Sequence, residues 1–147
     1  MKIKSAEYVN EDKVYRSSDH LTYSCQYHVV FCPKYRRKIL VGKYKERAIE
    51  VFKEVAAKRN FKIIEMEVMS DHVHLLIDCN PKFGICKCVC QLKDTSSRVL
   101  RAEFPELTTR LPSLWTRSSF ISSVGATSLD VVKEYIENQE RQVNVKR

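Results

Sequence analysis

The chain alternates two kinds of hydrophobic pattern, and their order limits the folds that it can adopt. Segments 43–60 and 85–104 carry apolar residues at helical spacing, with charged residues between them. Segment 127–142 has the same spacing, with Thr127 or Ser128 as a candidate N-cap. Runs rich in β-branched and aromatic residues, typical of strands, occupy residues 21–33, 61–69, 72–79 and part of 111–125. The sequence therefore predicts the order β-α-β-β-α-β-α.

The first six elements match the split β-α-β arrangement of ferredoxin-like folds, which belong to the α+β class. Such a fold places helices on one face of an antiparallel sheet and leaves the other face free. The last helix, which carries Tyr135, is then an addition at the C-terminus. Residues 1–20 lack a clear period and form an N-terminal extension, interpreted as an arm or an extra edge element. We expect residues 21–147 to form a single domain, since a chain of this length can bury a core without disulfides.

The stretch VMSDHVHLLIDC, residues 68–79, places two histidines in an otherwise apolar strand. Alternate residues of a strand point to the same face, so His72 and His74 share one face while their apolar neighbours face the core. Two imidazoles at this spacing can converge on one metal ion. The alternative is that both histidines are half-buried and make ordinary hydrogen bonds. A histidine pair without a third ligand favours this alternative. Asp71 either orients His72 or caps the preceding turn, and the sequence leaves both open.

The last helix offers a candidate for a third ligand. Tyr135 and Gln139 are four residues apart and therefore lie on one helical face, along the flank of the apolar stripe. Both can contact the body of the protein while presenting polar tips. The alternative is a tyrosine packed into the core and a solvated glutamine.

The charge balance points to a polyanionic partner. Lys plus Arg is 26 and Asp plus Glu is 18, which gives +8 and favours nucleic acid over a membrane surface. A basic loop surrounds Tyr35 at a strand end, where charge can hold phosphate and the ring can stack on a base. That loop supplies Lys34, Arg36, Arg37 and Lys38. Three further arginines are weaker candidates for DNA contacts, because each taken by itself is interpreted as a solvated surface charge: Arg98, Arg101 and Arg117.

The six cysteines do not have the spacing of a zinc site. Cys86, Cys88 and Cys90 follow a Cys-x-Cys-x-Cys pattern, and helical residues two apart point away from each other. They are interpreted as small hydrophobic residues of a reducing compartment. The chain has no apolar run long enough for a transmembrane helix and no signal-peptide pattern, so the expected location is cytoplasmic.

Three stretches together resemble one protein family. YHVVFCPKYRRKIL, MSDHVHLLI and SSFISSVGATSLDVVKEYIENQ are similar, in order and spacing, to the single-tyrosine HUH transposases of small insertion sequences, relatives of the REP-associated tyrosine transposases. The resemblance runs from about residue 21 to residue 142. It implies a ferredoxin-like homodimer that cleaves and rejoins single-stranded DNA and recognises subterminal hairpins. Residues 1–19 and the cysteine-rich second helix have no counterpart in this pattern.

The resemblance also implies roles for particular residues. Tyr135 matches the nucleophile, His72, His74 and Gln139 match the metal ligands, and Gly125 matches the hinge before the tyrosine helix. In the family that helix can complete the active site of the other subunit, and the sequence does not decide between the two arrangements.

The expected reaction leaves a 5′-phosphotyrosine and a free 3′-OH, and rejoining needs no ATP because the covalent link conserves the bond energy. Imidazole softness favours Mn²⁺, Zn²⁺ or Co²⁺ over Mg²⁺, while phosphate oxygens and abundance favour Mg²⁺, and we expect Mg²⁺ or Mn²⁺ to support activity. One rival interpretation is a non-catalytic ferredoxin-like nucleic-acid-binding module. Another is a metal-dependent hydrolase or metal sensor that uses the histidines without covalent capture of DNA.

Overall fold

The computed structural model describes residues 6–10, 13–18, 21–23, 25–124 and 134–139. Its main sheet has four antiparallel strands in the order β5-β6-β4-β7. The strands are β4 (Gln26–Phe31), β5 (Lys62–Met69), β6 (His72–Asp78) and β7 (Phe120–Ser123). With one helix after β4 and another after β6, this is the predicted split β-α-β arrangement, and the α+β ferredoxin-like prediction is confirmed.

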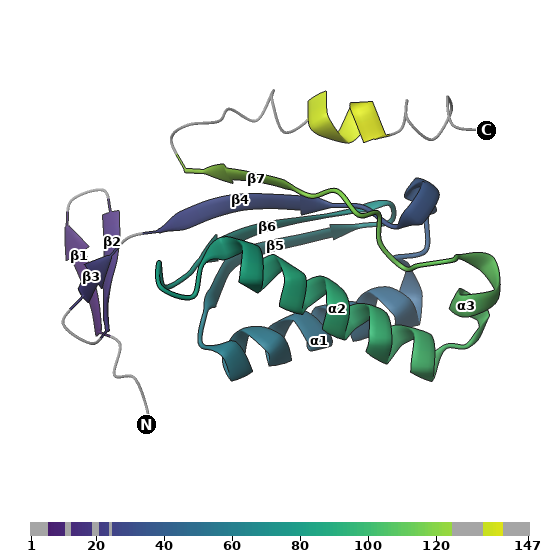
Figure 1. The fold of residues 1–147 in the computed structure, drawn as a ribbon, viewed down its shortest axis with the longest axis horizontal. Coiled ribbons are helices and arrows are strands. Elements are labelled where there is room, and N and C mark those ends of the chain that lie inside the picture. The colour runs from purple at the N-terminus through teal and green to yellow at the C-terminus, as the bar shows by residue number, and fades with distance from the viewer. Residues whose placement is uncertain (1–5, 11–12, 19–20, 24, 125–133, 140–147) are drawn as a thin grey trace.

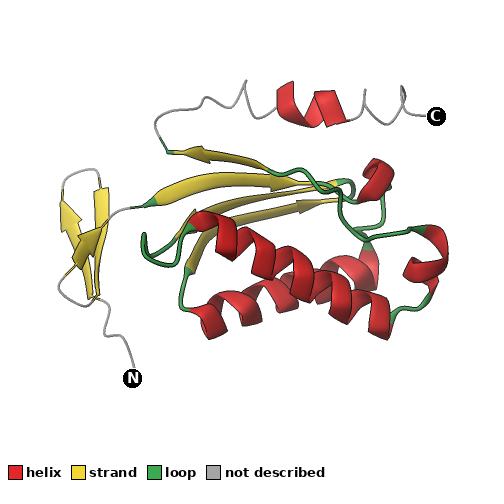
Figure 2. Ribbon diagram, viewed as in Figure 1, coloured by secondary structure: helices red, strands yellow, loops and turns green. Residues whose placement is uncertain are grey.

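Two long helices cover one face of the sheet. They are α1 (Gly42–Arg59) and α2 (Ile85–Glu103), and both agree with the predicted segments to within about a residue at each end. Figures 1 and 2 show them packed side by side on the same side of the strands. The helical segment 134–139 lies on the opposite side, next to β7. The face predicted to be free is therefore the face on which this segment docks.

The core lies between the sheet and the two long helices. Val73, Leu75 and Ile77 of β6 are fully buried there, as their alternation with the histidines predicts. Phe31 packs edge-on against Phe52 of α1, with ring centroids 5.9 Å apart. Further buried residues come from α1 (Ala48, Val51, Val55, Ala56) and from α2 (Cys88, Val89, Leu92, Ser96, Leu100).

The segment that follows α2 returns the chain to the sheet across the core. It contains a short helix, α3 (Glu106–Arg110), which the sequence analysis did not predict. Trp115 is buried, packs edge-on against Phe31 at 4.8 Å, and donates its indole N–H to Ser96 Oγ at 2.9 Å. This hydrogen bond explains why a serine is fully buried on the apolar stripe of α2.

The predicted strand 21–33 is wrong as a single element. It divides into β3 (Leu21–Tyr23) and β4, and only β4 belongs to the main sheet. β3 pairs instead with β2 (Lys13–Ser18), which pairs with β1 (Ala6–Asn10) in a separate antiparallel sheet. The described strands of the extension therefore do not form an edge element of the main sheet, because they pair with each other and with β3.

The cysteines of α2 only partly match their predicted role. Cys88 is fully buried and packs as a small hydrophobic residue, but Cys86 and Cys90 are exposed. The spacing itself explains this, since residues two apart on a helix cannot all face the core.

Candidate active site

His72 and His74 lie on the sheet face opposite to α1 and α2. Both side chains are half-buried, while Val73 between them is fully buried on the core side. The predicted division of β6 into a histidine face and an apolar face is therefore confirmed. β6 pairs with β5 in a hairpin and with β4 on its other side, so the histidines lie in the middle of the sheet.

One nitrogen of His72 is held by Asp71. The distance from His72 Nδ1 to Asp71 Oδ1 is 2.9 Å, and Asp71 Oδ2 lies 3.0 Å from Arg36 Nε. Of the two roles left open for Asp71, the structure supports the orienting one. The contact leaves Nε2 of His72 as the nitrogen available to an external ligand.

His74 contacts a third histidine that the sequence analysis did not single out. His28 of β4 places its Nδ1 3.2 Å from His74 Nε2, and Glu67 Oε2 lies 3.9 Å from His74 Nδ1. Burial lowers the pKa of His74, and the neighbouring His28 lowers it further, against an opposing effect of Glu67. The site therefore favours neutral imidazole, which is the form that binds metals.

The helical segment 134–139 docks on the same face through β7. Phe120 and His74 both pair with Val30, on opposite sides of β4, so their side chains share a face. The Tyr135 ring packs against Phe120 with centroids 5.1 Å apart. Tyr135 is half-buried, and Gln139 is buried rather than solvated.

Ser118 joins the two functional candidates of this helix. Tyr135 donates its hydroxyl proton to Ser118 Oγ at 3.4 Å, and Ser118 Oγ donates to Gln139 Oε1 at 3.4 Å. Burial raises the pKa of Tyr135 above its ordinary value, and the hydrogen bond with Ser118 opposes that rise. Ser118 was not predicted from the sequence, because a hydroxyl in a coil segment carries no periodic signal.

The donor set fits a divalent cation that keeps open positions. Within residues that the structure describes, no three His, Cys, Asp or Glu side chains converge to hold a metal. The residues that would hold such a cation are His72 and His74, through their imidazoles, and Gln139 on the docked helix, through its amide oxygen. All three side chains are neutral, so they would leave the charge of a bound cation available to phosphate oxygens.

The basic loop lies beyond the end of β4. Its first part is the 3-10 turn η1 (Lys34–Arg36), in which Tyr35 has a φ of 58° and is 46% exposed. The Lys34 ammonium lies 5.4 Å from the centre of the Tyr35 ring. Arg37 and Lys38 are exposed, whereas the Arg36 guanidinium is engaged with Asp71.

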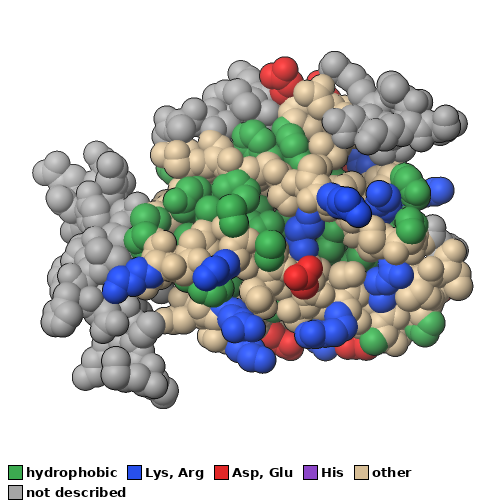
Figure 3. Space-filling model, viewed as in Figure 1, with side chains coloured by type: hydrophobic (Ala, Val, Ile, Leu, Met, Phe, Trp, Pro, Cys, Tyr) green, Lys and Arg blue, Asp and Glu red, His purple; other side chains and the backbone are tan. Residues whose placement is uncertain are grey.

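The weaker DNA-binding candidates lie in different surroundings. Arg98 and Arg117 are exposed, and Arg101 donates from Nη1 to the Leu111 carbonyl at 3.1 Å. Figure 3 shows Lys and Arg side chains in several separate places on its face of the molecule, with Asp and Glu between them.

The candidate hinge Gly125 and the candidate N-caps Thr127 and Ser128 lie outside the described residues. None of the described helices is long and apolar enough to cross a membrane.

Comparison with known proteins gives consistent matches. The family model described as IS200-like transposase matches residues 21–139. The ISDra2 transposase TnpA of Deinococcus radiodurans is 35% identical over 119 residues, which cover 80% of this chain and 85% of the relative. The IS200 transposase of Salmonella typhimurium is 29% identical over 126 residues, which cover 84% of this chain and 82% of the relative.

Two solved structures have a similar fold. A crystal structure described as a transposase from Deinococcus radiodurans superposes with a TM-score of 0.76 at 29% identity, covering 84% of this chain and 96% of that chain. A REP-associated tyrosine transposase bound to a REP hairpin superposes with a TM-score of 0.54 at 15% identity, covering 83% and 68%. The second likeness concerns the fold alone.

Proposed function

The chain belongs to the family of IS200-like transposases, and from this premise we propose that it cleaves and rejoins single-stranded DNA at insertion-sequence ends through a 5′-phosphotyrosine on Tyr135. The observation that carries the proposal is the docking of Tyr135 and Gln139 on the sheet face that holds His72 and His74. A nucleophile and three neutral metal ligands on one face are the parts that this chemistry requires.

The covalent step exchanges one phosphodiester for another. The Tyr135 oxygen releases its proton to solvent and attacks the scissile phosphorus, the bond from phosphorus to the 3′ oxygen breaks, and that oxygen leaves as a 3′-OH after taking up a proton from solvent. In rejoining, the 3′-OH of another strand attacks the same phosphorus and releases the tyrosine. One phosphoryl bond is broken and one formed in each step, so no ATP is consumed.

Tyr135 has to lose its proton for this attack, and its surroundings influence that loss. Burial raises the pKa of the phenol, which disfavours the phenolate at neutral pH. Ser118 can rotate its single hydroxyl proton from Gln139 Oε1 to the phenolate as it forms, which acts in the opposite direction and releases its hydrogen bond to Gln139 for that moment. We expect the fraction of reactive phenolate to increase with pH across the neutral range.

The proposed ligands of Mg²⁺ or Mn²⁺ are His72, His74 and Gln139. A bound cation would polarise the scissile phosphate and neutralise charge that develops on its oxygens. Asp71 holds the His72 ring by its Nδ1, and Ser118 holds the Gln139 amide, so the chain's own contacts orient both side chains. If cleavage is unchanged in excess chelator, the metal part of the proposal is wrong.

The DNA partner and the assembly are also proposals. The REP-associated tyrosine transposase is bound to a REP hairpin. We propose that this chain also recognises DNA hairpins and that it forms a homodimer. The exposed Tyr35, with Lys34, Arg37 and Lys38 beside it, is the surface we assign to DNA contacts. Arg117 adds an exposed cation next to Ser118, which hydrogen-bonds Gln139 of the helical segment 134–139.

A Tyr135→Phe variant separates a transposase from a non-catalytic binding module. The variant should bind single-stranded element-end DNA as the wild type does, but it should form no covalent adduct on a denaturing gel. Tyr44→Phe is the matched control, because Tyr44 lies on α1 and bonds Glu106, away from the histidine face. A wild-type protein that binds DNA and Mn²⁺ but never forms an adduct would favour the binding module instead.

A further inference from the structure

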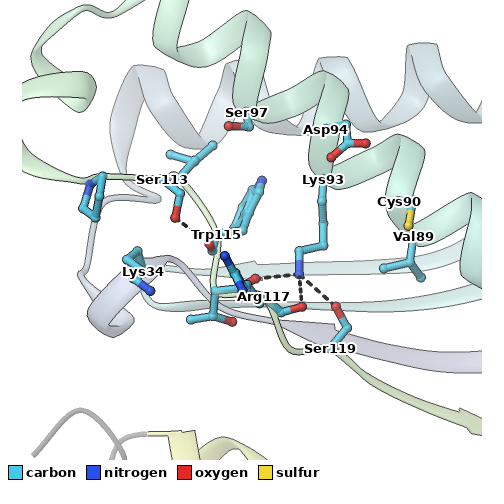
Figure 4. A pocket seen from close by; sticks show the side chains of 13 residues that line it. Lys34, Val89, Cys90, Lys93, Asp94, Ser97, Ser113, Trp115, Arg117 and Ser119 are labelled. Carbon is cyan, nitrogen blue, oxygen red and sulfur yellow. Dashed lines mark hydrogen bonds between the residues drawn. The ribbon is translucent and has the colours of Figure 1, made fainter. Parts of the chain in front are cut away.

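Lys93 donates to an unusual set of acceptors. It lies near the middle of α2 with a half-buried side chain. Its ammonium contacts the carbonyl oxygens of Thr116 at 2.7 Å, Ser118 at 3.2 Å and Arg117 at 3.4 Å, and Ser119 Oγ at 3.0 Å. Figure 4 shows the bonds to Thr116, Arg117 and Ser119, which converge on Nζ at the edge of a cavity. Four consecutive residues therefore surround a single cation.

Among the residues that the structure describes, Lys93 donates most of the side-chain hydrogen bonds that the coil 116–119 receives, and the Ser118 carbonyl also accepts from Thr116 Oγ1 at 3.2 Å. The coil lies between buried Trp115 and the start of β7, and it belongs to neither a helix nor a strand. A lysine ammonium has three donors, and here the chain's own oxygens take them up. Lys93 thus shapes the coil in the way that a bound monovalent cation would.

The coil 116–119 also contacts the helical segment that carries Tyr135. Ser118, whose carbonyl accepts from Lys93, contacts Tyr135 and Gln139 through its Oγ. The next residues lead into β7, where Phe120 packs against the Tyr135 ring. A continuous set of contacts therefore runs from the core helix α2, through one coil, to the nucleophile.

We infer that Lys93 is a positioning residue for Tyr135 and Gln139, because it fixes the coil that carries Ser118. This inference rests on the proposed function of Tyr135 as the nucleophile and of Gln139 as a metal ligand. Displacement of the coil by as little as about 1 Å moves both groups together, and misplacement of that size can cost on the order of 100-fold in rate.

A direct DNA contact is the competing role for Lys93. The side chain borders a cavity of about 590 Å³ that Lys34 and Arg117 also line, and a cationic cavity can hold a phosphate. The geometry favours positioning, because the protons that a phosphate would need are already donated to Thr116, Ser118 and Ser119. The two roles differ in what they predict for DNA affinity.

The first test compares Lys93→Met with Lys87→Met, an exposed lysine on the same helix. We expect Lys93→Met to lower the single-turnover cleavage rate on the order of 10- to 100-fold, with the Kd for single-stranded element-end DNA unchanged. Lys87→Met should change neither quantity. A Lys93→Met variant that cleaves at the wild-type rate, or one that loses DNA affinity in proportion to rate, would overturn the inference.

Chemical rescue distinguishes positioning from a general loss of structure. Lys93→Ala removes the ammonium and the side-chain stem, so added propylammonium should restore part of the cleavage rate. Tetramethylammonium, which has no N–H donor, should restore none of it. Equal rescue by both ions, or no rescue by either, counts against the inference.

Hydrogen exchange tests the same contact without any cleavage. In the DNA-free protein, Lys93→Met should speed amide exchange in residues 116–120 and 134–139, while the β5–β6 hairpin keeps its wild-type protection. If the wild type forms no adduct but this pattern is found, the proposed function fails and the positioning contact stands. If exchange in 134–139 is unchanged, the positioning inference fails on its own.

Discussion

Asp71 bridges two side chains at the start of β6, and its position decides what His72 can do. One carboxylate oxygen contacts His72 Nδ1 and the other contacts Arg36 Nε. A carboxylate that accepts the Nδ1 proton fixes the tautomer in which Nε2 keeps its lone pair for a metal. Arg36, predicted as a DNA contact, takes part in the site through this ion pair.

Replacing Asp71 by asparagine should weaken metal binding in the DNA-free protein. The neutral amide oxygen accepts from Nδ1–H more weakly than a carboxylate and stabilises this tautomer less, and loss of such an outer partner costs roughly 10- to 100-fold in metal affinity. Titration calorimetry with Mn²⁺ measures the change. Glu46→Gln on the exposed surface of α1 is the control and should bind Mn²⁺ as the wild type does. An unchanged Kd for Asp71→Asn would show that the carboxylate does not orient the ligand.

The face on which a single residue lies could be predicted where strand or helix periodicity determines it. Strand alternation alone gives the shared face of His72 and His74, and helical spacing gives the shared face of Tyr135 and Gln139. The contact of His28 with His74 joins residues 46 positions apart and depends on the register of β4 against β6. Ser118 lies in a coil, so neither period marks it.

At the scale of single elements, the end of α1 depends on one left-handed residue. Asn60 caps the helix with φ 58° and ψ 43°, and its N–H bonds the Ala56 carbonyl. Asparagine tolerates this conformation better than other non-glycine residues, and a β-branched residue tolerates it least. The cap directs the chain from α1 into β5.

Asn60→Val should therefore lower the free energy of unfolding by about 1–2 kcal/mol, while Asn60→Gly should leave it unchanged or raise it slightly. Urea unfolding followed by circular dichroism measures both variants. Equal stability of the two variants would mean that the left-handed conformation does not govern the end of α1.

The bounds of helices and strands with a strong hydrophobic period agreed with the prediction, and those of elements without such a period did not. The bounds of α1, α2, β5 and β6 follow from hydrophobic spacing and from turn residues. The division of residues 21–33 into β3 and β4 could not be read locally, because the two halves differ only in the strand with which they pair. The short helix α3 spans five residues, which is too few to show a period.

At the scale of the whole molecule, the chain combines a family domain with an added sheet. The IS200-like match begins at residue 21, and Val29 is the first buried core residue among those from residue 25 on, whose burial the structure describes. Figure 1 shows the small sheet β1–β2–β3 beyond the start of β4, away from the helical segment 134–139. The proposed site therefore lies entirely within the family domain.

Removing residues 1–23 deletes the whole of that sheet. Because the core and the candidate site lie after this point, the shortened protein should fold and form the covalent adduct at the full-length rate. The measurement is adduct yield over time, with circular dichroism as the control for folding. A folded variant that has lost adduct formation would assign the added sheet a part in the reaction.

The central claim concerns which atom of the DNA becomes bonded to Tyr135, and end-labelled DNA tests it directly. Single-stranded element-end DNA, labelled at its 5′ or its 3′ end, is incubated with protein and Mn²⁺ and resolved on a denaturing gel. The account predicts that the 3′-labelled fragment migrates with the protein, while the 5′-labelled fragment is free and ends in an extendable 3′-OH. It is contradicted if both fragments are free of protein, if the 5′-labelled fragment carries the protein, or if Tyr135→Phe still forms the adduct.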